Sequence, residues 1–327
     1  MTTTPYRFGT HADVPDLVSQ LTRLSNLAFA EYEGAMPIDE EFMAWYLQRP
    51  GSRPELCPVA LDQDSLVCNV LVALQGLQLG GQVLPCGIID TVATAPAHRR
   101  RGLARRLMHA SHDLMRRAGA EAAVLYTNPD GHPYGFYQSL GYETRATGAA
   151  LMGRRPEAQC PVSMVRAGTH EHQAVRALLD SHYALYEGYA PMTDKLWRWH
   201  RTHRPASMPI ELLVTHDASG LVTGTAAYAE VELLLKGSRV KTSVISDWAS
   251  SMAQPGFMQA ALARAANEQI MALVDADSPA CDMLTALGFC QAVREVAMVL
   301  PFTDRAREAM ASKSGPWYIM IESVVGV

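Results

Sequence analysis

Apolar and polar positions divide the chain into short helices and long strands. Residues 103–118 carry apolar side chains at helical spacing, with Leu103, Leu107 and Leu114 on one face. The stretch AAVLY at 122–126 predicts a buried strand. Two long apolar stretches meet at Gly80–Gly81, which predicts a hairpin. Helices are predicted before and after this hairpin. Such an order of helices and strands predicts an α/β (α+β) fold, a mixed and mostly antiparallel sheet flanked by helices.

The pattern occurs twice along the chain. YRFGTH at 6–11 returns as VRAGTH at 165–170, GIIDTVAT at 87–94 matches SVISDWAS at 243–250, and FYQSLGYE at 136–143 matches MLTALGFC at 283–290. Because the three matches keep the same order, we predict a duplicated unit. The polar stretch 153–161 would then separate a domain at 1–155 from a second domain at 162–300, followed by a C-terminal tail at 301–327.

Composition narrows the class of protein. The 327 residues are 48% hydrophobic and 19% charged, with a net charge of −5, which suits two globular domains. An acidic chain argues against a general nucleic-acid binder. The N-terminus has no signal-peptide pattern, no apolar stretch is long enough to cross a bilayer, and the six cysteines are scattered. We expect a cytoplasmic protein with free thiols.

A basic turn stands out against this acidic background. HRRRGLARR at 98–106 joins the end of a predicted strand to the helix that begins near Gly102. A helix start presents unsatisfied amide groups and a positive dipole end, which together bind phosphate. A solvated basic turn, with arginines paired to surface acids, is the alternative.

The turn belongs to a pattern that resembles a known family. VATAPAHRRRGLARRLM is similar to the acetyl-CoA signature of the GNAT N-acetyltransferase superfamily, with Arg99, Gly102 and Ala104 at the signature positions. YQSLGYE matches the later part of the family pattern at Tyr137 and Gly141. The resemblance implies two tandem GNAT-like domains.

As a tandem arrangement, the chain is similar to the enhanced intracellular survival (Eis) group. About 26 residues follow Pro301, so the terminal sterol-carrier-like domain of that group is expected to be missing. Mycothiol synthase-like enzymes are the other tandem relatives that this pattern fits.

The resemblance implies a site for acetyl-CoA as cosubstrate and no metal. The expected cofactor-binding residues are Val92, Ala93 and Thr94 for the pantetheine arm, Arg99, Arg100, Arg101, Gly102, Leu103, Ala104 and Arg105 around the pyrophosphate, and Asn128. Asn128 departs from the family pattern, because the family asparagine counts back to Asp130.

Two residues are candidates for the chemistry of transfer. By resemblance, Tyr137 is the general acid that protonates the departing thiolate, whereas its alternative role is simple packing. Asp90 is the only charge between Leu84 and Pro96. A carboxylate on such a strand suits either a base that accepts the ammonium proton or a structural hydrogen-bond acceptor.

The second copy serves as an internal comparison. Thr94 to Tyr137 spans 43 positions, whereas the matching Ser250 to Leu284 spans 34, so the region of the basic turn is nine positions shorter. Leu284 cannot donate a proton where Tyr137 can. We therefore predict activity in the N-terminal domain and a degenerate second domain that supports it.

The acceptor is identified only by class. An acidic stretch at 30–46 contains Glu31, Glu33, Asp39, Glu40 and Glu41, which would attract amines or would simply be solvated. The aromatic stretch 194–205 suits nucleotide stacking or a helix docked into the core. We expect a small-molecule or lysine-type amine acceptor, neither nucleic acid nor membrane as partner, and leave a homo-oligomer open.

Three functions fit the sequence. The first is an acetyl-CoA-dependent N-acetyltransferase that transfers the acetyl group directly to an amine. The second is a transferase for another acyl-CoA, and the third is a regulatory protein that binds CoA without turnover.

Overall fold

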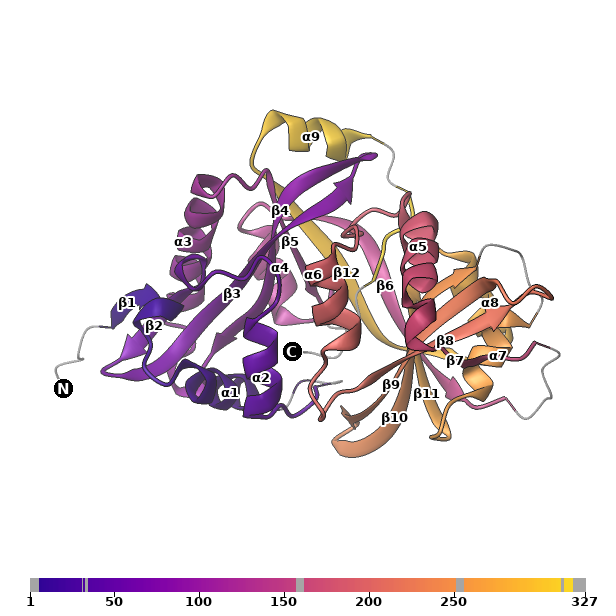
Figure 1. Ribbon diagram of the computed structural model, residues 1–327. Coiled ribbons are helices and arrows are strands. Elements are labelled where there is room, and N and C mark those ends of the chain that lie inside the picture. Colours follow the sequence, from indigo (N-terminus) through magenta and orange to yellow (C-terminus); the bar gives the residue numbers. More distant parts are fainter. Residues whose placement is uncertain are drawn as a thin grey trace.

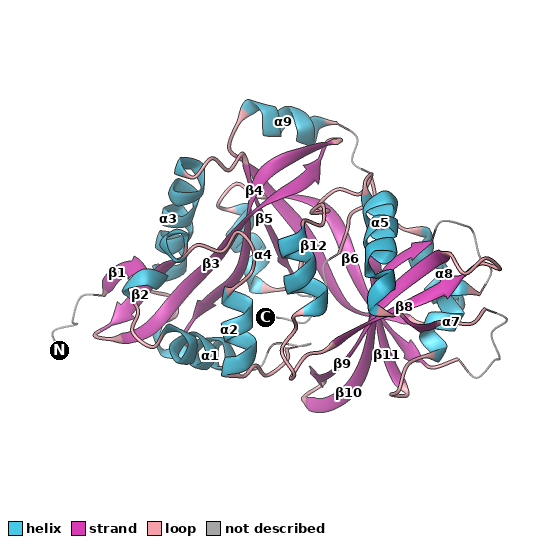
Figure 2. Cartoon of the chain, viewed as in Figure 1, coloured by secondary structure: helices cyan, strands magenta, loops and turns pink. Residues whose placement is uncertain are grey.

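The computed structural model describes residues 6–30, 32, 35–156, 162–250, 256–312 and 315–319. Figure 1 shows two similar halves side by side, with the first half in indigo to magenta and the second in red to yellow. Strands form the centre of each half and helices cover them (Figure 2).

The first half follows the predicted order, with one additional short strand. Its strands are β1 (Arg7–Thr10), β2 (Pro58–Asp62), β3 (Ser65–Leu79), β4 (Gln82–Thr94), β5 (Ala122–Thr127) and β6 (Glu143–Arg154). Its helices are α1 (Leu17–Ala28), α2 (Glu40–Leu47), α3 (Leu103–Arg117) and α4 (His132–Gln138). The β3–β4 hairpin turns at Gly80 and Gly81, both with positive φ, as the sequence predicts.

The second half repeats this order, with α6 and α7 shorter than α2 and α3. Its strands are β7 (Val165–Arg166), β8 (Ile210–His216), β9 (Val222–Leu235), β10 (Ser238–Ser250), β11 (Gln269–Asp275) and β12 (Cys290–Pro301). Its helices are α5 (His172–Tyr183), α6 (Asp194–Trp197) with a π-helical turn at Arg198–Thr202, α7 (Phe257–Ala263) and α8 (Pro279–Ala286), and α9 (Asp304–Ala311) follows. The repeat predicted from the sequence is therefore a structural repeat.

All twelve strands join in one sheet, in the order β1-β2-β3-β4-β5-β12-β6-β11-β10-β9-β8-β7. The two halves exchange strands at its centre. The last strand of the second half, β12, lies between β5 and β6, while β6 pairs with β11 of the second half. Each half thus completes its sheet with a strand of the other.

Helices cover both faces of the first half. A Cβ atom on Gly87 of β4 would lie 1.9 Å from Sδ of Met115, so α3 packs directly on the backbone of that face. Side chains alternate along a strand, so Ile88 and Asp90 point to the opposite face. There Asp90 meets Tyr46 and Arg49, from α2 and the residues just after it.

A pseudo-two-fold relation links the halves. Trp45 and Trp199 stack with ring centroids 4.5 Å apart and planes 5° apart. The Trp45 indole donates to the Trp199 carbonyl (3.2 Å), and the Trp199 indole donates to the Trp45 carbonyl (3.0 Å). Equivalent residues thus exchange equivalent bonds, as in a symmetric dimer interface.

Residues near the C-terminus pack into the same interior. Trp317 is 1% exposed, its indole donates to the Tyr126 hydroxyl (2.8 Å), and its amide donates to Asp275 (2.6 Å). The described part of the tail therefore joins the core. No helix in the described ranges is long and apolar enough to cross a membrane.

Candidate active site

The centre of the first half contains an opening between two parallel strands. β4 and β5 pair only from Cys86–Ala122 to Ile88–Val124, although β4 continues to Thr94. Opposite β3, the register shifts between Ile89 and Val92, so that Asp90 and Thr91 form a β-bulge. Among the described residues, the β5-facing edge of β4 therefore has no strand partner along Val92, Ala93 and Thr94.

The basic turn lies just beyond this opening. Pro96–His98 forms a short 3-10 helix, and α3 begins after Gly102, which has φ 74°. A Cβ atom on Gly102 would meet nothing within 4 Å, and the first turn of α3 contains no acidic residue. The first amide to bond within the helix is that of Arg106, so the amides of Leu103, Ala104 and Arg105 have no partner in the helix. Together with the open space beside Gly102 and the positive end of the dipole, they suit phosphate.

The arginine side chains of the turn differ in their roles. Arg99 donates to the carbonyls of Thr94 (3.3 Å) and Ala28 (2.9 Å), and Arg101 donates to the Tyr6 hydroxyl (2.9 Å). These bonds hold the turn in place. Arg100 is exposed, has φ 60°, and makes no hydrogen bond or ion pair with a described residue. Arg100 is therefore the arginine that is available to a phosphate group.

Arg105 and Asn128 also contact the protein itself. Arg105 donates to the Ser139 hydroxyl (2.8 Å), which ties the start of α3 to the end of α4. The Asn128 side chain accepts from the Asp130 amide (2.8 Å) and so shapes the loop after β5. In this arrangement the Asn128 side chain stabilises its own turn.

Tyr137 lies on α4 and is 8% exposed. Its ring contacts Phe136 and Tyr142, and its hydroxyl makes no hydrogen bond with a described residue. Burial raises the pKa of Tyr137 above its usual value, with a smaller contribution from Tyr32. The hydroxyl therefore stays protonated across the physiological range, as a proton donor must.

Asp90 is held by two donors on the opposite face of the sheet. The Tyr46 hydroxyl and the Arg49 guanidinium both donate to its Oδ2 atom. Side-chain exposure is 1% for Arg49 and 12% for Asp90. Because a guanidinium remains charged even when buried, its positive charge balances the Asp90 carboxylate.

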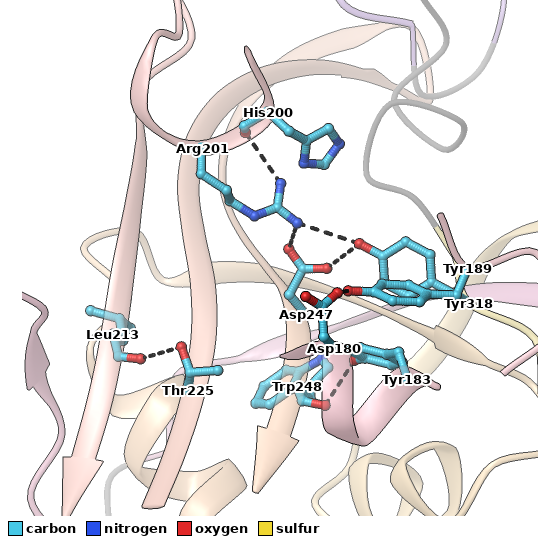
Figure 3. Close-up of polar contacts among 10 residues, drawn as sticks. All are labelled: Asp180, Tyr183, Tyr189, His200, Arg201, Leu213, Thr225, Asp247, Trp248 and Tyr318. Carbon is cyan, nitrogen blue, oxygen red and sulfur yellow. Dashed lines mark hydrogen bonds and ion pairs between the residues drawn. The ribbon is translucent and has the colours of Figure 1, made fainter. Parts of the chain in front are cut away.

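The second half contains the same ion pair. The sequence match aligns Asp247 with Thr91, but the structure shifts this match by one residue, because the β10 bulge falls at Asp247 and Trp248 as the β4 bulge falls at Asp90 and Thr91. Asp247 thus takes the place of Asp90. Arg201 donates to it, with the Tyr318 hydroxyl as a second donor at 2.5 Å (Figure 3). An ion pair kept in both copies has a role in packing, which supports the structural interpretation of Asp90.

Other features of the second half differ from the first. The pairing of β10 with β11 ends at Ile245 and Ala272, just as the pairing of β4 with β5 ends partway along β4. Beyond this point in the second half, however, Trp248 and Phe257 are buried, with ring centroids 6.5 Å apart. Leu284, at the position of Tyr137, is fully buried on α8. Gly256 opens α7 with φ 82°, much as Gly102 opens α3, but α7 has only seven residues. The matching stretch 251–255 lies outside the described residues.

Two cavities lie between the α1–α2 segment and the second half. Their volumes are about 290 and 340 Å³, and both are lined by Met36, Pro37 and Ile38. Three acidic side chains line the smaller cavity, with one lysine: Asp39, Glu230, Glu232 and Lys241. Phe42 of the same cavity stacks on Tyr46, the donor to Asp90, so this aromatic pair connects the acidic cavity to the Asp90 ion pair.

The acidic residues of the α1–α2 region also have local roles. Asp39 caps α2 by accepting from the Phe42 amide (2.7 Å), and Glu41 accepts from the Ala206 amide (3.1 Å). Glu40 is exposed, and Glu31 and Glu33 lie outside the described residues. In the aromatic stretch, Trp197 and Trp199 are buried, which confirms the interpretation of a helix docked into the core.

Sequence reasoning missed three residues of this site. Arg49 lies two residues after the end of the apolar helix α2 and is fully buried. Tyr32 lies between the helices α1 and α2, and its pKa is raised to about 12 by burial and by Glu295. Glu295 is 6% exposed on β12. The charged pair Arg294–Glu295 before the apolar run VAMVL was the available signal, but only the strand exchange places Glu295 here.

Comparison with known proteins identifies the first half. Residues 14–145 match the family model of the acetyltransferase (GNAT) domain. The first half is therefore similar to a GNAT acetyltransferase domain. Among curated proteins, no sequence matches the chain significantly.

Solved structures extend this GNAT likeness to nearly the whole chain. Saccharomyces cerevisiae N-myristoyltransferase with bound myristoyl-CoA aligns with a TM-score of 0.71 at 12% identity, over 92% of this chain and 83% of that one. A GCN5-related N-acetyltransferase from Anabaena variabilis gives 0.66 at 15% identity, over 92% and 74%. A tandem GNAT protein from the clavulanic acid biosynthesis pathway gives 0.67 at 16% identity, over 91% and 98%. The fold is therefore GNAT-like, and the tandem arrangement has a solved counterpart.

GNAT acetyltransferase domains, to which the first half is similar, use an acyl-CoA as cosubstrate. The residues of the first half fit such a cosubstrate, because the β4–β5 opening leads to a helix start with free amides, an open Gly102 and no acidic group. Within the described ranges, no group of three or more histidine, cysteine or acidic residues could hold a metal ion.

Proposed function

We propose that this protein is an acetyl-CoA-dependent N-acetyltransferase whose active site lies in the N-terminal domain. The observation that carries the proposal is the opening between β4 and β5, which leads from the Asp90–Thr91 bulge to the free amides at the start of α3. The cosubstrate supplies an activated acetyl group as a thioester, which an amine attacks directly.

The chain contributes binding, orientation and proton transfer. Amides of Leu103 to Arg105 and the Arg100 side chain bind the diphosphate, while the unpaired edge at Val92–Thr94 holds the pantetheine arm. Tyr137 gives a proton to the thiolate as it leaves. The binding sites thus hold the reactants in position, and Tyr137 completes the transfer.

We assign the supporting role to the second domain, residues 162–300. Trp248 and Phe257 lie where its own opening begins, and Leu284 replaces the proton donor. The second domain contributes β12 to the sheet of the first. In this proposal, the chain shares its tandem organisation with the Eis group.

The acceptor in this proposal is a cationic amine, either a small molecule or a lysine side chain. The acidic cavity lined by Asp39, Glu230 and Glu232 supports a cation, because three carboxylates outnumber Lys241 there.

Thiol release from acetyl-CoA over a panel of amines tests the proposed function. The expected result is release that depends on one class of amine, with product mass increased by one acetyl group. Tight CoA binding without release for any amine would instead favour a regulatory CoA-binding protein.

A second acyl group is the specific alternative, because the yeast structure with a similar fold binds myristoyl-CoA. Competition between acetyl-CoA and myristoyl-CoA for the same amine distinguishes the two. We expect acetyl transfer to be faster, and a preference for myristoyl-CoA would reassign the cosubstrate.

A further inference from the structure

A carboxylate of the second half lies inside the site of the first. β12 pairs with β5, and Ala297 lies opposite Tyr126 in this antiparallel pair. Glu295 is two residues before Ala297 and therefore shares the face of Tyr126. Val124 lies on that face as well and pairs with Ile88, two residues before Asp90. Asp90, Tyr126 and Glu295 thus occupy one face of three neighbouring strands.

Glu295 is nearly enclosed yet unsatisfied. It is 6% exposed, and its Oε2 atom has no hydrogen-bond partner among the described residues. Asp90, by contrast, is held by Tyr46 and Arg49. A buried carboxylate without a donor is costly in a purely structural role, so its retention needs another explanation.

The pseudo-two-fold relation gives Glu295 a natural comparison. Aligning LGYETRATG at 140–148 with LGFCQAVRE at 287–295 makes Gly148 the counterpart of Glu295. The two residues also pair with each other across β6 and β12. A Cβ atom on Gly148 would lie 2.8 Å from Cδ1 of Ile319, so a larger residue would require the Ile319 side chain to shift. The first site thus receives a carboxylate from β12, whereas the second receives a glycine from β6.

We propose that Glu295 is the general base of the transfer reaction, contributed to the active site of the first domain by the exchanged strand β12. This inference rests on the proposed function. Glu295 takes a proton from the acceptor ammonium. The neutral nitrogen then forms the C–N bond to the acetyl carbon as the C–S bond breaks, and the thiolate takes its proton from Tyr137. The second proton of the attacking nitrogen restores the Tyr137 hydroxyl through solvent.

The surroundings of Glu295 suit this role. Burial, together with the nearby charge of Asp90, raises the pKa of Glu295 to about 8. A carboxylate with so high a pKa accepts a proton far more readily than an exposed one. The other titratable or charged groups near it are Tyr32 and Tyr126, whose own pKa values Glu295 raises, and Arg49 and Tyr46, which bind Asp90.

The test compares the full-length protein with Glu295→Gln, using the amine of the panel (spermidine, an Nα-acetyl-lysine amide and glucosamine) that the wild type acetylates fastest. We expect kcat to fall about 100-fold with the KM for acetyl-CoA unchanged. The wild-type rate should rise with pH up to about 8, and this rise should be lost in the variant. Glu187→Gln is the matched control, because Glu187 is also a buried carboxylate but accepts from the Gly80 amide.

A second variant separates chemistry from folding. Glu295→Gly removes the carboxylate and leaves space opposite Gly148, so added formate should restore the rate in proportion to its concentration. A packing role predicts no rescue. Full activity of Glu295→Gln would overturn the base role while leaving the proposed function intact. Absence of acetylation by the wild type itself would refute the proposed function, and the base role with it.

Discussion

Single residues in this protein take their roles from burial and from the partners that burial leaves them. Asp90 and Tyr137 were both chosen from the sequence as catalytic candidates, yet they lie in different surroundings. Two donors bind Asp90, whereas the Tyr137 hydroxyl has no partner among the described residues. A hydroxyl without a fixed partner is available to a substrate, so Tyr137 is the better candidate for chemistry.

The first prediction concerns this hydroxyl. Tyr137→Phe should lower kcat about 100-fold, because the thiolate loses its proton donor, and should leave acetyl-CoA affinity nearly unchanged. Thiol release measures the rate, and titration calorimetry measures the affinity. Tyr134→Phe on the same helix is the control, since that hydroxyl bonds to Thr144 (3.0 Å). A large loss of affinity in Tyr137→Phe would contradict the acid role.

The second prediction concerns two buried histidines. Burial lowers the pKa of His11 and of His112 to about 4, and both are hydrogen-bonded, to Asn69 (2.6 Å) and the Tyr142 hydroxyl (2.8 Å). Unfolding lets each histidine take up a proton near pH 6.5, so between about pH 6.5 and 4 the unfolded state binds more protons. The free energy of unfolding should therefore fall as pH falls through that window.

Thermal melts at a series of pH values measure this effect. His112→Gln should flatten the dependence, since the amide does not titrate, even if the variant is less stable at pH 8. An unchanged slope between pH 6.5 and 4 would show that His112 is already charged in the folded protein.

At the scale of elements, the start of α3 and the bulge of β4 define the candidate cosubstrate site. The N-terminus of α3 has no acidic residue in its first turn and opens on a left-handed glycine. Just after the C-terminal end of α3, Gly119 also has a left-handed conformation (φ 87°), and a Cβ atom there would meet nothing within 4 Å. The helix therefore carries two glycines in matched conformations, one at each end.

The third prediction compares these two glycines. Gly102→Glu should weaken CoA binding more than about tenfold, because a carboxylate there adds bulk and repels the diphosphate. Gly119→Glu introduces the same strain and charge at the far end of α3 and should bind CoA normally. Titration calorimetry with CoA measures both. Equal binding by the two variants would refute the diphosphate site at the start of α3.

Elements of the sequence differed in how well they could be predicted. Helix α3 and the β3–β4 hairpin follow from local patterns, leucines at helical spacing and a Gly–Gly turn. The repeat could be recognised because both halves have the same Gly-Thr and Leu-Gly turns in the same order. The position of β12 was not predictable, since an apolar strand of either half could pair with β5. Consequently Glu295, whose significance depends on that pairing, was missed, as was Arg49, whose partner lies on another element.

At the scale of the whole molecule, the exchanged strands make the halves mutually dependent. Without residues after 160, β5 would lose its neighbour β12, and β6 would lose both of its partners. Unpaired central strands expose backbone groups and apolar surface. The Trp45–Trp199 stack and the buried Trp317 would be lost as well.

The fourth prediction follows from this dependence. A fragment of residues 1–160 expressed alone should be unfolded or aggregated, whereas co-expression with residues 161–327 should give a soluble complex that binds CoA. Circular dichroism and size-exclusion chromatography measure the outcome. A folded, CoA-binding fragment 1–160 would show that β12 is dispensable to the first half.

Strand exchange also bears on why a duplicated protein would keep both copies in one polypeptide. In a dimer of identical chains, the positions of Glu295 and Gly148 would hold the same residue and would face each other across the symmetry axis. Two glutamates there would repel one another, and two glycines would leave both centres without a general base. A single polypeptide removes that constraint, because its two halves can carry different residues at equivalent positions.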